Sequence, residues 1–162
     1  MPPGRQSARR SPREAEVRIR IVLVAPPAGV DFGLQEGKGH DYETIQKQRS
    51  HGSHLTFHCT LKAKGNRGDG LPILLGPLAQ GSPTGRFIYI DVGQYAGQKD
   101  CPFSRRIKIP LGAITWEMID RTTADESSVL EARIPGTGKD GGPSCATVQP
   151  AEGWKLVRQG SG

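Results

Sequence analysis

The sequence predicts an all-β domain, an antiparallel sandwich or small barrel of about eight short strands with one or two short helices. Three observations support this fold class. Apolar and polar side chains alternate along several segments, which is the period of a strand. The 162 residues include 22 Gly and 13 Pro, and this high content favours many turns. The length is that of one domain with its own hydrophobic core.

Three parts of the chain differ in composition. Residues 1–15 are rich in Pro, Ser and Arg and carry no large apolar side chain beyond Met1. Such a segment buries too little surface to offset the entropy lost on ordering, so we expect a disordered basic tail. Residues 16–158 are expected to form the single β-rich domain, and residues 159–162 a flexible C-terminus.

The first half of the domain contains two clear strand patterns. One begins near Glu16 and ends before Pro26 and Pro27, which cannot donate to a ladder. The other covers residues 53–62, where apolar residues alternate with histidine, threonine and lysine. A short strand is expected over residues 32–35. The stretch 41–49 is predicted to be a helix capped by Asp41.

The second half contains a strand that is apolar on both faces, residues 86–92. This pattern is typical of a central strand covered on both sides. Residues 76–85 before it are expected to form a long irregular loop. The other expected elements are an apolar strand over 73–75, an alternating strand over 105–111, a helix over 113–121, a strand over 129–134, a glycine-rich turn over 136–143, and closing strands over 145–148 and 154–157.

The cysteines and the apolar runs of the sequence indicate in which compartment the protein is found. The formal net charge is +6, and the three cysteines, Cys59, Cys101 and Cys145, contain no Cys-x-x-Cys pair. This pattern favours a reducing compartment over a disulfide framework. No apolar run approaches the roughly 20 residues that a membrane span requires. We therefore expect a cytoplasmic protein without a membrane partner.

Two glycine motifs lack the partners that their chemistry needs. Gly136, Gly138 and Gly141 have dinucleotide-binding spacing, but Gly-Pro-Ser follows them instead of the start of a helix. Gly76 and Gly81 have the spacing of a phosphate-binding loop, but Ser-Pro replaces the lysine and the hydroxyl that bind phosphate and Mg²⁺. Both motifs are therefore interpreted as turns.

His54 and His58 are the candidate metal ligands. On a helix they would share a face, but on the predicted strand they lie roughly 13 Å apart. Cys59 would point to the opposite face. We therefore expect no metal site. An alternative hypothesis is an enzyme of hydrolase or isomerase type, in which Asp91, His54 or His58 acts as general base.

Basic residues stand on the polar faces of several predicted strands. If these strands are neighbours in one sheet, their side chains form a cationic face that attracts an anionic ligand or nucleic acid. Weak, non-specific nucleic-acid association through this face and the basic tail is a further alternative. The residues are Arg18, Arg20, His54, His58, Lys62, Arg106 and Lys108, with Arg86 and Arg105 at strand starts.

Six segments together resemble an uncharacterised bacterial family catalogued only as a domain of unknown function. They are APPAGV (25–30), FGLQ (32–35), GPLAQG (76–81), RFIYI (86–90), RRIKIPL (105–111) and GPSCATV (142–148). The resemblance covers about Val17 to Val157 and implies no activity, cofactor or catalytic residue. It suggests that Gln35 and Gln80 belong to the family pattern, and that a site lies beside Arg86 and Tyr89.

The leading interpretation is a non-catalytic binding module for a small anionic or polar ligand, with no cofactor. Loops held by a rigid sheet are where binding groups concentrate. Amides donate and accept hydrogen bonds, a guanidinium binds carboxylate or phosphate, and a tyrosine ring stacks on a ligand. The oligomeric state is left open. The predicted ligand-binding residues are Gln35, Gln80, Arg86, Tyr89, Asp91 and Arg106.

Overall fold

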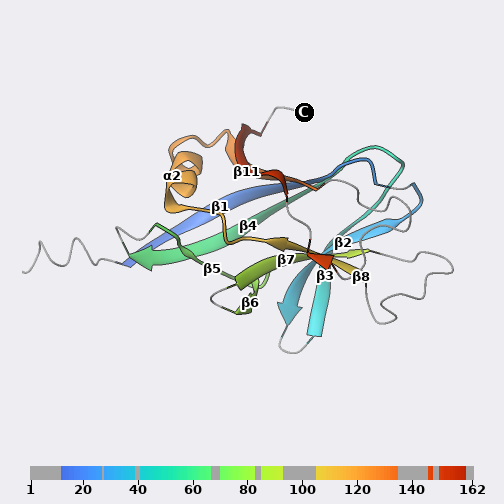
Figure 1. Ribbon diagram of the computed structural model, residues 1–162, viewed down its shortest axis with the longest axis horizontal. Coiled ribbons are helices and arrows are strands. Elements are labelled where there is room, and N and C mark those ends of the chain that lie inside the picture. Colours follow the sequence, from blue (N-terminus) through green and yellow to red (C-terminus); the bar gives the residue numbers. More distant parts are fainter. Residues whose placement is uncertain are drawn as a thin grey trace, which may run out of the picture.

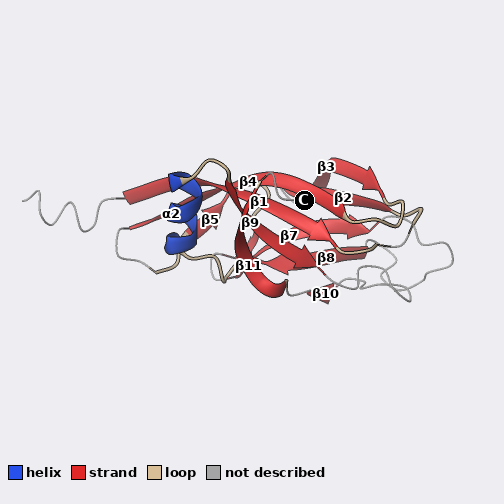
Figure 2. Ribbon diagram, turned by 90° about the horizontal axis from the view of Figure 1, so that it is seen from above, coloured by secondary structure: helices blue, strands red, loops and turns tan. Residues whose placement is uncertain are grey.

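In the computed structural model, the chain forms two β-sheets with a helix at one end (Figures 1 and 2). The structure describes residues 12–26, 28–38, 41–66, 70–82, 85–92, 105–134, 146–147 and 150–159. Within these residues, sheet A has the strand order β11-β9-β1-β4-β5. Sheet B has the order β10-β8-β7-β2-β3, with β6 beside β7. The predicted all-β sandwich is confirmed.

Sheet A is built around β1. The strand β1 pairs antiparallel with β4 and parallel with β9, so not every pair has the antiparallel direction expected from the sequence. Its odd-numbered residues from Val17 to Leu23 are buried, as their alternation predicted. The strands of sheet A are β1 (Pro12–Leu23), β4 (Leu55–Asn66), β5 (Ile73–Leu75), β9 (Ser128–Ile134) and β11 (Ala151–Arg158).

Sheet B is built around β7. This strand pairs with β8 along one edge and with β6 and then β2 along the other, which confirms its predicted central position. Its two faces differ, because Ile88 and Ile90 are buried whereas Phe87 and Tyr89 are only partly covered. The strands are β2 (Asp31–Lys38), β3 (Asp41–Arg49), β6 (Gln80–Ser82), β7 (Gly85–Val92), β8 (Arg105–Pro110) and β10 (Ala146–Thr147).

The hydrophobic core lies between the sheets. Alternate residues of facing strands enter it, and burying each large side chain contributes about 1.5–3 kcal/mol. These side chains define the inner face of each sheet, so the other parity defines its outer face. The largest fully buried ones include Ile19, Ile21, Leu23, Phe32, Leu34, Phe57, Leu61, Ile88, Ile90, Ile107 and Ile109.

Trp154 joins the two sheets at one edge. Strand β11 loses regular register between Ala151 and Lys155, and Glu152 and Gly153 have positive φ angles of 61° and 74°. After this bulge, Trp154 is only 5% exposed. Its Nε1 donates a hydrogen bond of 3.1 Å to the carbonyl of Pro110 in β8. The bulge thus turns an aromatic side chain of sheet A toward a backbone acceptor of sheet B.

The helix α2 (Trp116–Ala124) follows β8, beginning and ending three residues later than the predicted range 113–121. Thr115 caps it by accepting a hydrogen bond from the backbone nitrogen of Met118. Figures 1 and 2 place α2 beside the amino-terminal half of β1, at the opposite end of the molecule from β2 and β3. Among the described helical residues, no stretch is long and apolar enough to cross a membrane.

The prediction of a helix over residues 41–49 is wrong, because this segment is strand β3. Its polar side chains have strand roles. Gln46 Nε2 donates to the carbonyl of His58 at 2.6 Å, and Gln48 Nε2 donates to the carbonyl of Thr56 at 2.7 Å. These amides cover backbone acceptors of β4 in the other sheet. They explain why an edge strand can be polar on both faces.

Two strands are longer than their sequence patterns indicated. Strand β1 begins at Pro12 and not near Glu16, and β4 continues to Asn66, beyond the expected end at residue 62. Part of the predicted loop 76–85 forms strand β6. Residues 1–11, Cys101, Cys145 and the motif at Gly136–Gly141 lie outside the described residues.

Candidate functional site

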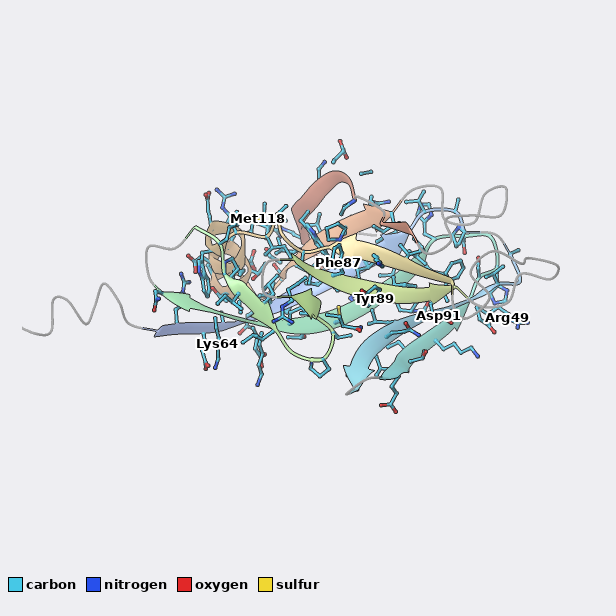
Figure 3. The ribbon with its side chains drawn as sticks, turned by 60° about the horizontal axis from the view of Figure 1, so that its bottom comes forward. Arg49, Lys64, Phe87, Tyr89, Asp91 and Met118 are labelled. Carbon is cyan, nitrogen blue, oxygen red and sulfur yellow. The ribbon has the colours of Figure 1, made fainter. Side chains whose placement is uncertain are left out.

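The strand register gathers most of the predicted ligand-binding residues on the outer face of sheet B. Directly opposed residues of paired strands share a face. Gln35 lies opposite Tyr89, Asp91 opposite Arg106, and Gln80 opposite Phe87. Figure 3 shows Phe87, Tyr89 and Asp91 following one another along β7. Arg106 shares this face by its backbone position, while its side chain is outside the described set.

Gln35 and Gln80 meet where β7 changes partner from β6 to β2. Both residues are nearly buried, with exposed fractions of 8% and 9%. Gln80 Nε2 donates to the backbone carbonyl of Gln35 at 3.3 Å. Within the described part of the chain, the buried Oε1 of Gln35 has no hydrogen-bond partner. An acceptor left in this state is costly, by about 1–3 kcal/mol, so it is a position where a donor would stabilise the protein.

Tyr89 lies within a small group of aromatic and cationic side chains. Its ring centroid is 6.5 Å from that of Phe87, with 29° between the ring planes. Lys108 Nζ lies 5.9 Å from the Tyr89 centroid, inside the range of a cation–π contact. The residues Tyr89 and Lys108 are opposed in register. This part of the outer face therefore combines apolar ring surface with positive charge.

Arg86 is placed apart from Tyr89. It has the same parity as Ile88 and Ile90, so it stands on the other side of β7. Its Nη1 donates to the carbonyl of Ala79 at 3.2 Å, which ties the segment before β6 to β7. The structure therefore gives Arg86 a positioning contact and does not bring it to the outer face with the other predicted residues.

A hollow of about 540 Å³ opens on the outer face beside Asp91. We call it the Gly33 hollow, because Gly33 lines it and lies between Asp91 on β7 and Lys47 on β3. A Cβ atom at Gly33 would lie 2.6 Å from Cγ2 of Thr44, so a larger residue would collide with this wall. The hollow is lined by Gly29, Asp31, Phe32, Gly33, Thr44, Lys47, Arg49 and Asp91.

Charged groups dominate this lining. Arg49 binds Asp31 through two contacts, Nε to Oδ1 at 2.9 Å and Nη2 to Oδ2 at 3.3 Å. Lys47 Nζ lies 3.7 Å from Asp31 Oδ2. The hydrogen bond from Arg49 holds the pKa of Asp31 below its ordinary value and raises the pKa of Arg49. Both groups are therefore charged at neutral pH.

Sequence reasoning identified Asp91 but missed the other charged residues of the Gly33 hollow, namely Asp31, Lys47 and Arg49. The segment of β3 that carries Lys47 and Arg49 was interpreted as a helix. One signal was present, because a glycine inside a strand pattern often marks a close approach of another group. Gly33 stands between Phe32 and Leu34 in such a pattern.

The structure divides the expected cationic face between the two sheets. Arg18 and Arg20 belong to β1 in sheet A, whereas Lys108 and Arg106 belong to β8 in sheet B. Arg18 donates to backbone carbonyls at the end of α2 and the start of β9, including Thr122 and Ser128. These basic residues therefore form no single continuous surface.

The side chain of Arg20 forms a buried ion pair with Glu131. Its Nη2 lies 2.6 Å from Glu131 Oε2, and both side chains are less than a tenth exposed. A hollow of about 260 Å³ is lined by both partners of this pair, whose charges neutralise each other. A third hollow, of about 550 Å³, lies over Ala15, Ala63 and Leu75. Neither contains a predicted ligand-binding residue.

No described contact joins His54 or His58 to Asp91. His54 precedes β4, and its Nδ1 accepts a hydrogen bond from the backbone nitrogen of Ala25 at 3.0 Å. His58 lies on β4, which confirms the strand interpretation of this segment. Neither histidine hydrogen-bonds a carboxylate among the described contacts. The described residues also hold no group of three His, Cys, Asp or Glu placed to bind a metal ion.

Comparison with known proteins gives a family and no activity. The model of a family of unknown function, DUF5990, matches residues 17–157. No curated protein and no solved structure matches the chain. The match covers the described strands from β1 to β11 almost completely. The chain therefore belongs to DUF5990, a family of unknown function.

Proposed function

We propose that the protein is a non-catalytic binding module for a small polar ligand that occupies the Gly33 hollow. One observation carries this proposal. A residue without a side chain lies in register between an aspartate and a lysine, and the side chain of Thr44 lies over it, so charged residues stand on both sides of a position that contributes no side chain of its own. A Cβ atom at position 33 would lie 2.6 Å from Thr44 Cγ2 and displace it, so the hollow keeps its present shape only with glycine at this position.

The size and lining of the hollow fit a small hydrophilic molecule. Its volume of about 540 Å³ lies within the range of small-molecule sites, roughly 300–1,000 Å³. Lys47 and Arg49 can donate hydrogen bonds to an anionic group, and the carboxylate of Asp91 can accept them from a donor. The three strands β7, β2 and β3 hold these groups, so little ordering is needed on binding.

The neighbouring amides extend the same face. Gln35 lies two residues beyond Gly33 on β2 and therefore points to the same side. Its unpartnered Oε1 is an acceptor for a donor group of a ligand that reaches past the hollow. Tyr89, opposite Gln35, supplies ring surface at the same level. Gln35 and Tyr89 thereby support the proposal with residues predicted from the sequence.

The experiment is a thermal-shift screen of polar metabolites against the wild-type protein and against a variant in which the hollow is filled. Gly33→Val adds a side chain to the hollow, and Thr44→Ala removes the Cγ2 atom that a new Cβ would meet. The double variant keeps every charge of the lining. Thr44→Ala alone controls for the loss of that wall, and Lys62→Ala in sheet A is the control for a remote exposed change.

The proposal expects a ligand that raises the melting temperature of wild type and of Lys62→Ala, but not that of the filled variant. Circular dichroism of the unliganded variants checks that each one is folded. If every ligand stabilises the folded double variant as much as wild type, the ligand does not occupy the Gly33 hollow.

A further inference from the structure

Two segments that are distant in the sequence are fastened to each other beside the Gly33 hollow. One is the loop between β1 and β2, residues 24–30, and the other is the turn between β3 and β4, residues 50–54. The loop supplies Gly29 to the lining of the hollow. The contacts that hold the loop therefore also hold part of this lining.

Ser50 makes the part of this connection that does not depend on pH. Its side chain is buried, and its Oγ donates to the carbonyl of Pro26 at 3.2 Å and accepts from the backbone nitrogen of Gly52 at 3.1 Å. Its backbone nitrogen donates to the carbonyl of Val30 at 2.9 Å, and its carbonyl accepts from the nitrogen of Gly29 at 2.8 Å. Hydroxyl and backbone groups keep their protons at all physiological pH values, so these bonds persist.

Another hydrogen bond between the two segments is different, because its acceptor is a histidine. The backbone nitrogen of Ala25 donates to Nδ1 of His54 at 3.0 Å. A neutral imidazole has one donor nitrogen and one acceptor nitrogen, so this bond requires a neutral His54 with its hydrogen on Nε2. In a protonated imidazole both nitrogens are donors. Protonation therefore points one N–H group at another and breaks the bond.

The bond is made to a residue in a strained conformation. The φ angle of Ala25 is 45°, in the left-handed region where a residue with a Cβ atom is disfavoured. Such a conformation persists only while surrounding contacts hold it. Val24 is anchored on one side by its hydrogen bond to the carbonyl of Ile134 at 3.0 Å, and Pro26 on the other side by Ser50. Loss of the bond to His54 thus allows Ala25 itself to relax.

Within the described part of the chain, no ion pair fixes the charge of His54. Its side chain is exposed, so solvent protons reach it. Two of the charged groups around it already have partners, because Asp31 binds Arg49 at 2.9 Å. By chain position and strand register, the titratable and charged residues around His54 are His51 in the same turn, His58 further along β4, Asp31 and Arg49 where β2 begins and β3 ends, and Arg133 on β9.

We infer that His54 is a pH-sensitive latch on the loop between β1 and β2. While the imidazole is neutral, Nδ1 holds Ala25 in its left-handed conformation. When the imidazole is protonated, Ala25 is released, and the change reaches the Gly33 hollow through Gly29 in the same loop. Histidine is the side chain that ordinarily changes its charge between pH 5 and 8, so the latch opens in mild acid. This inference goes beyond the proposed function and concerns the protein without a ligand.

An NMR titration of the ligand-free, isotope-labelled full chain tests the inference, between about pH 8 and about pH 5. Long-range proton–nitrogen spectra follow the two ring nitrogens of His54, and amide spectra follow Ala25 and Gly29. We expect the hydrogen on Nε2 at the alkaline end, and amide shifts of Ala25 and Gly29 with the same midpoint as the His54 imidazole. Solvent exchange of the Ala25 amide, corrected for its intrinsic dependence on pH, should become about fivefold faster at the acidic end.

His54→Asn and His51→Asn are the matched variants. Asparagine places an amide oxygen near the position of Nδ1, so His54→Asn keeps an acceptor for Ala25 but does not titrate. In this variant, the amides of Ala25 and Gly29 should no longer shift with the wild-type midpoint. His51→Asn removes a histidine from the same turn and should leave the wild-type titration of both amides unchanged.

The inference is overturned if the Ala25 amide keeps its shift and its exchange rate while the His54 imidazole of the wild-type protein is titrated, a result that needs no variant. The same pH dependence in His54→Asn as in wild type would also overturn it, and so would its loss in His51→Asn, because another group would then carry the effect. None of these measurements uses a ligand. The metabolite screen with the filled variant therefore decides the proposed function separately.

Discussion

Gly33 and Asp91 lie directly opposite each other in the antiparallel pair of β2 and β7. A carboxylate thus faces a position with no side chain, on the side of the sheet turned away from the core. Lys47 completes the row from β3. The candidate site depends on this register, because moving either pair by one residue would turn one of these side chains toward the core.

The hydrogen bond of Trp154 to Pro110 is expected to hold the edge of the sandwich together. In Trp154→Phe the ring is largely kept, but Pro110 loses its indole donor. The expected loss of unfolding free energy is about 1–2 kcal/mol. In Trp154→Ala, the loss of a buried ring should cost about 3–5 kcal/mol. Urea denaturation measures both values.

Leu156→Ala on the same strand is the matched control for this prediction. Leu156 is 38% exposed, so its truncation should change the unfolding free energy by less than about 1 kcal/mol. A Trp154→Phe protein as stable as wild type would show that the indole hydrogen bond contributes nothing to the free energy of unfolding.

The buried pair of Arg20 and Glu131 should be sensitive to the loss of one partner. Arg20→Met leaves Glu131 in a nearly buried position, with Arg133 Nε at 3.0 Å as its remaining cationic contact. The expected destabilisation is about 3 kcal/mol, the lower end for an unpaired buried charge. Replacing both partners, as Arg20→Met with Glu131→Leu, should recover much of this loss in urea denaturation.

The exposed pair of Lys64 and Glu14 is the control for the buried pair. Lys64→Met breaks a contact of 2.9 Å between side chains that are 54% and 68% exposed. We expect its urea midpoint to match wild type, because exposed ion pairs contribute little. If Arg20→Met is as stable as Lys64→Met, the ion pair of Arg20 and Glu131 contributes nothing measurable to the free energy of unfolding.

Cys59 should react slowly while the protein is folded. Burial raises the pKa of its thiol to about 12, and only the thiolate is nucleophilic. Alkylation by iodoacetamide at pH 8 should therefore be more than about tenfold slower in native protein than in urea. Peptide mapping separates Cys59 from Cys101 and Cys145. Equal rates in the two states would show that the native thiol is accessible and ionises normally.

The same shift predicts the direction of a stability change in alkali. A thiol with a raised pKa in the folded state favours folding fully below its ordinary pKa of 9.0. The stabilisation is lost as the pH rises from there toward 12, because the unfolded chain ionises first. Cys59→Ala should therefore show a smaller loss of stability than wild type over this range.

Asp31 should contribute stability that acid removes. Its pKa is held below the ordinary value of 3.8, chiefly by the hydrogen bond from Arg49. The contribution is present above that value and is lost as the pH falls through the lowered pKa. The difference in melting temperature between wild type and Asp31→Asn should thus be constant near neutrality and shrink below about pH 4. A difference independent of pH would contradict the assigned pairing.

The alternation of apolar residues was enough to predict β1 and β4, because one side of each strand is buried, and the continuous apolar run 86–92 was enough to predict β7. It failed for β3. The spacing of Tyr42, Ile45 and Arg49 matches a helix as well as an edge strand. The deciding contacts come from Gln46 and Gln48 to backbone carbonyls of β4, and these depend on how the two sheets meet.

The candidate site could be predicted only in part for a similar reason. Six residues were predicted as one group, and the strand register brings five of them to one face, namely Gln35, Gln80, Tyr89, Asp91 and Arg106. Lys47 and Gly33 become neighbours only through the pairing of β2 with β3, which a single sequence does not reveal. Arg86 was predicted to belong to the same group, but it has the parity of Ile88 and therefore stands on the other side of β7.

The measurement that tests the account most directly is a set of amide chemical shifts, recorded while the best ligand of the metabolite screen is added to isotope-labelled protein. The account predicts that the largest saturable changes occur at Gly33, Thr44, Lys47 and Asp91, while β1 and β9 of sheet A change little. Changes centred instead on the Arg20–Glu131 hollow, with the amides around Gly33 unaffected, would contradict it.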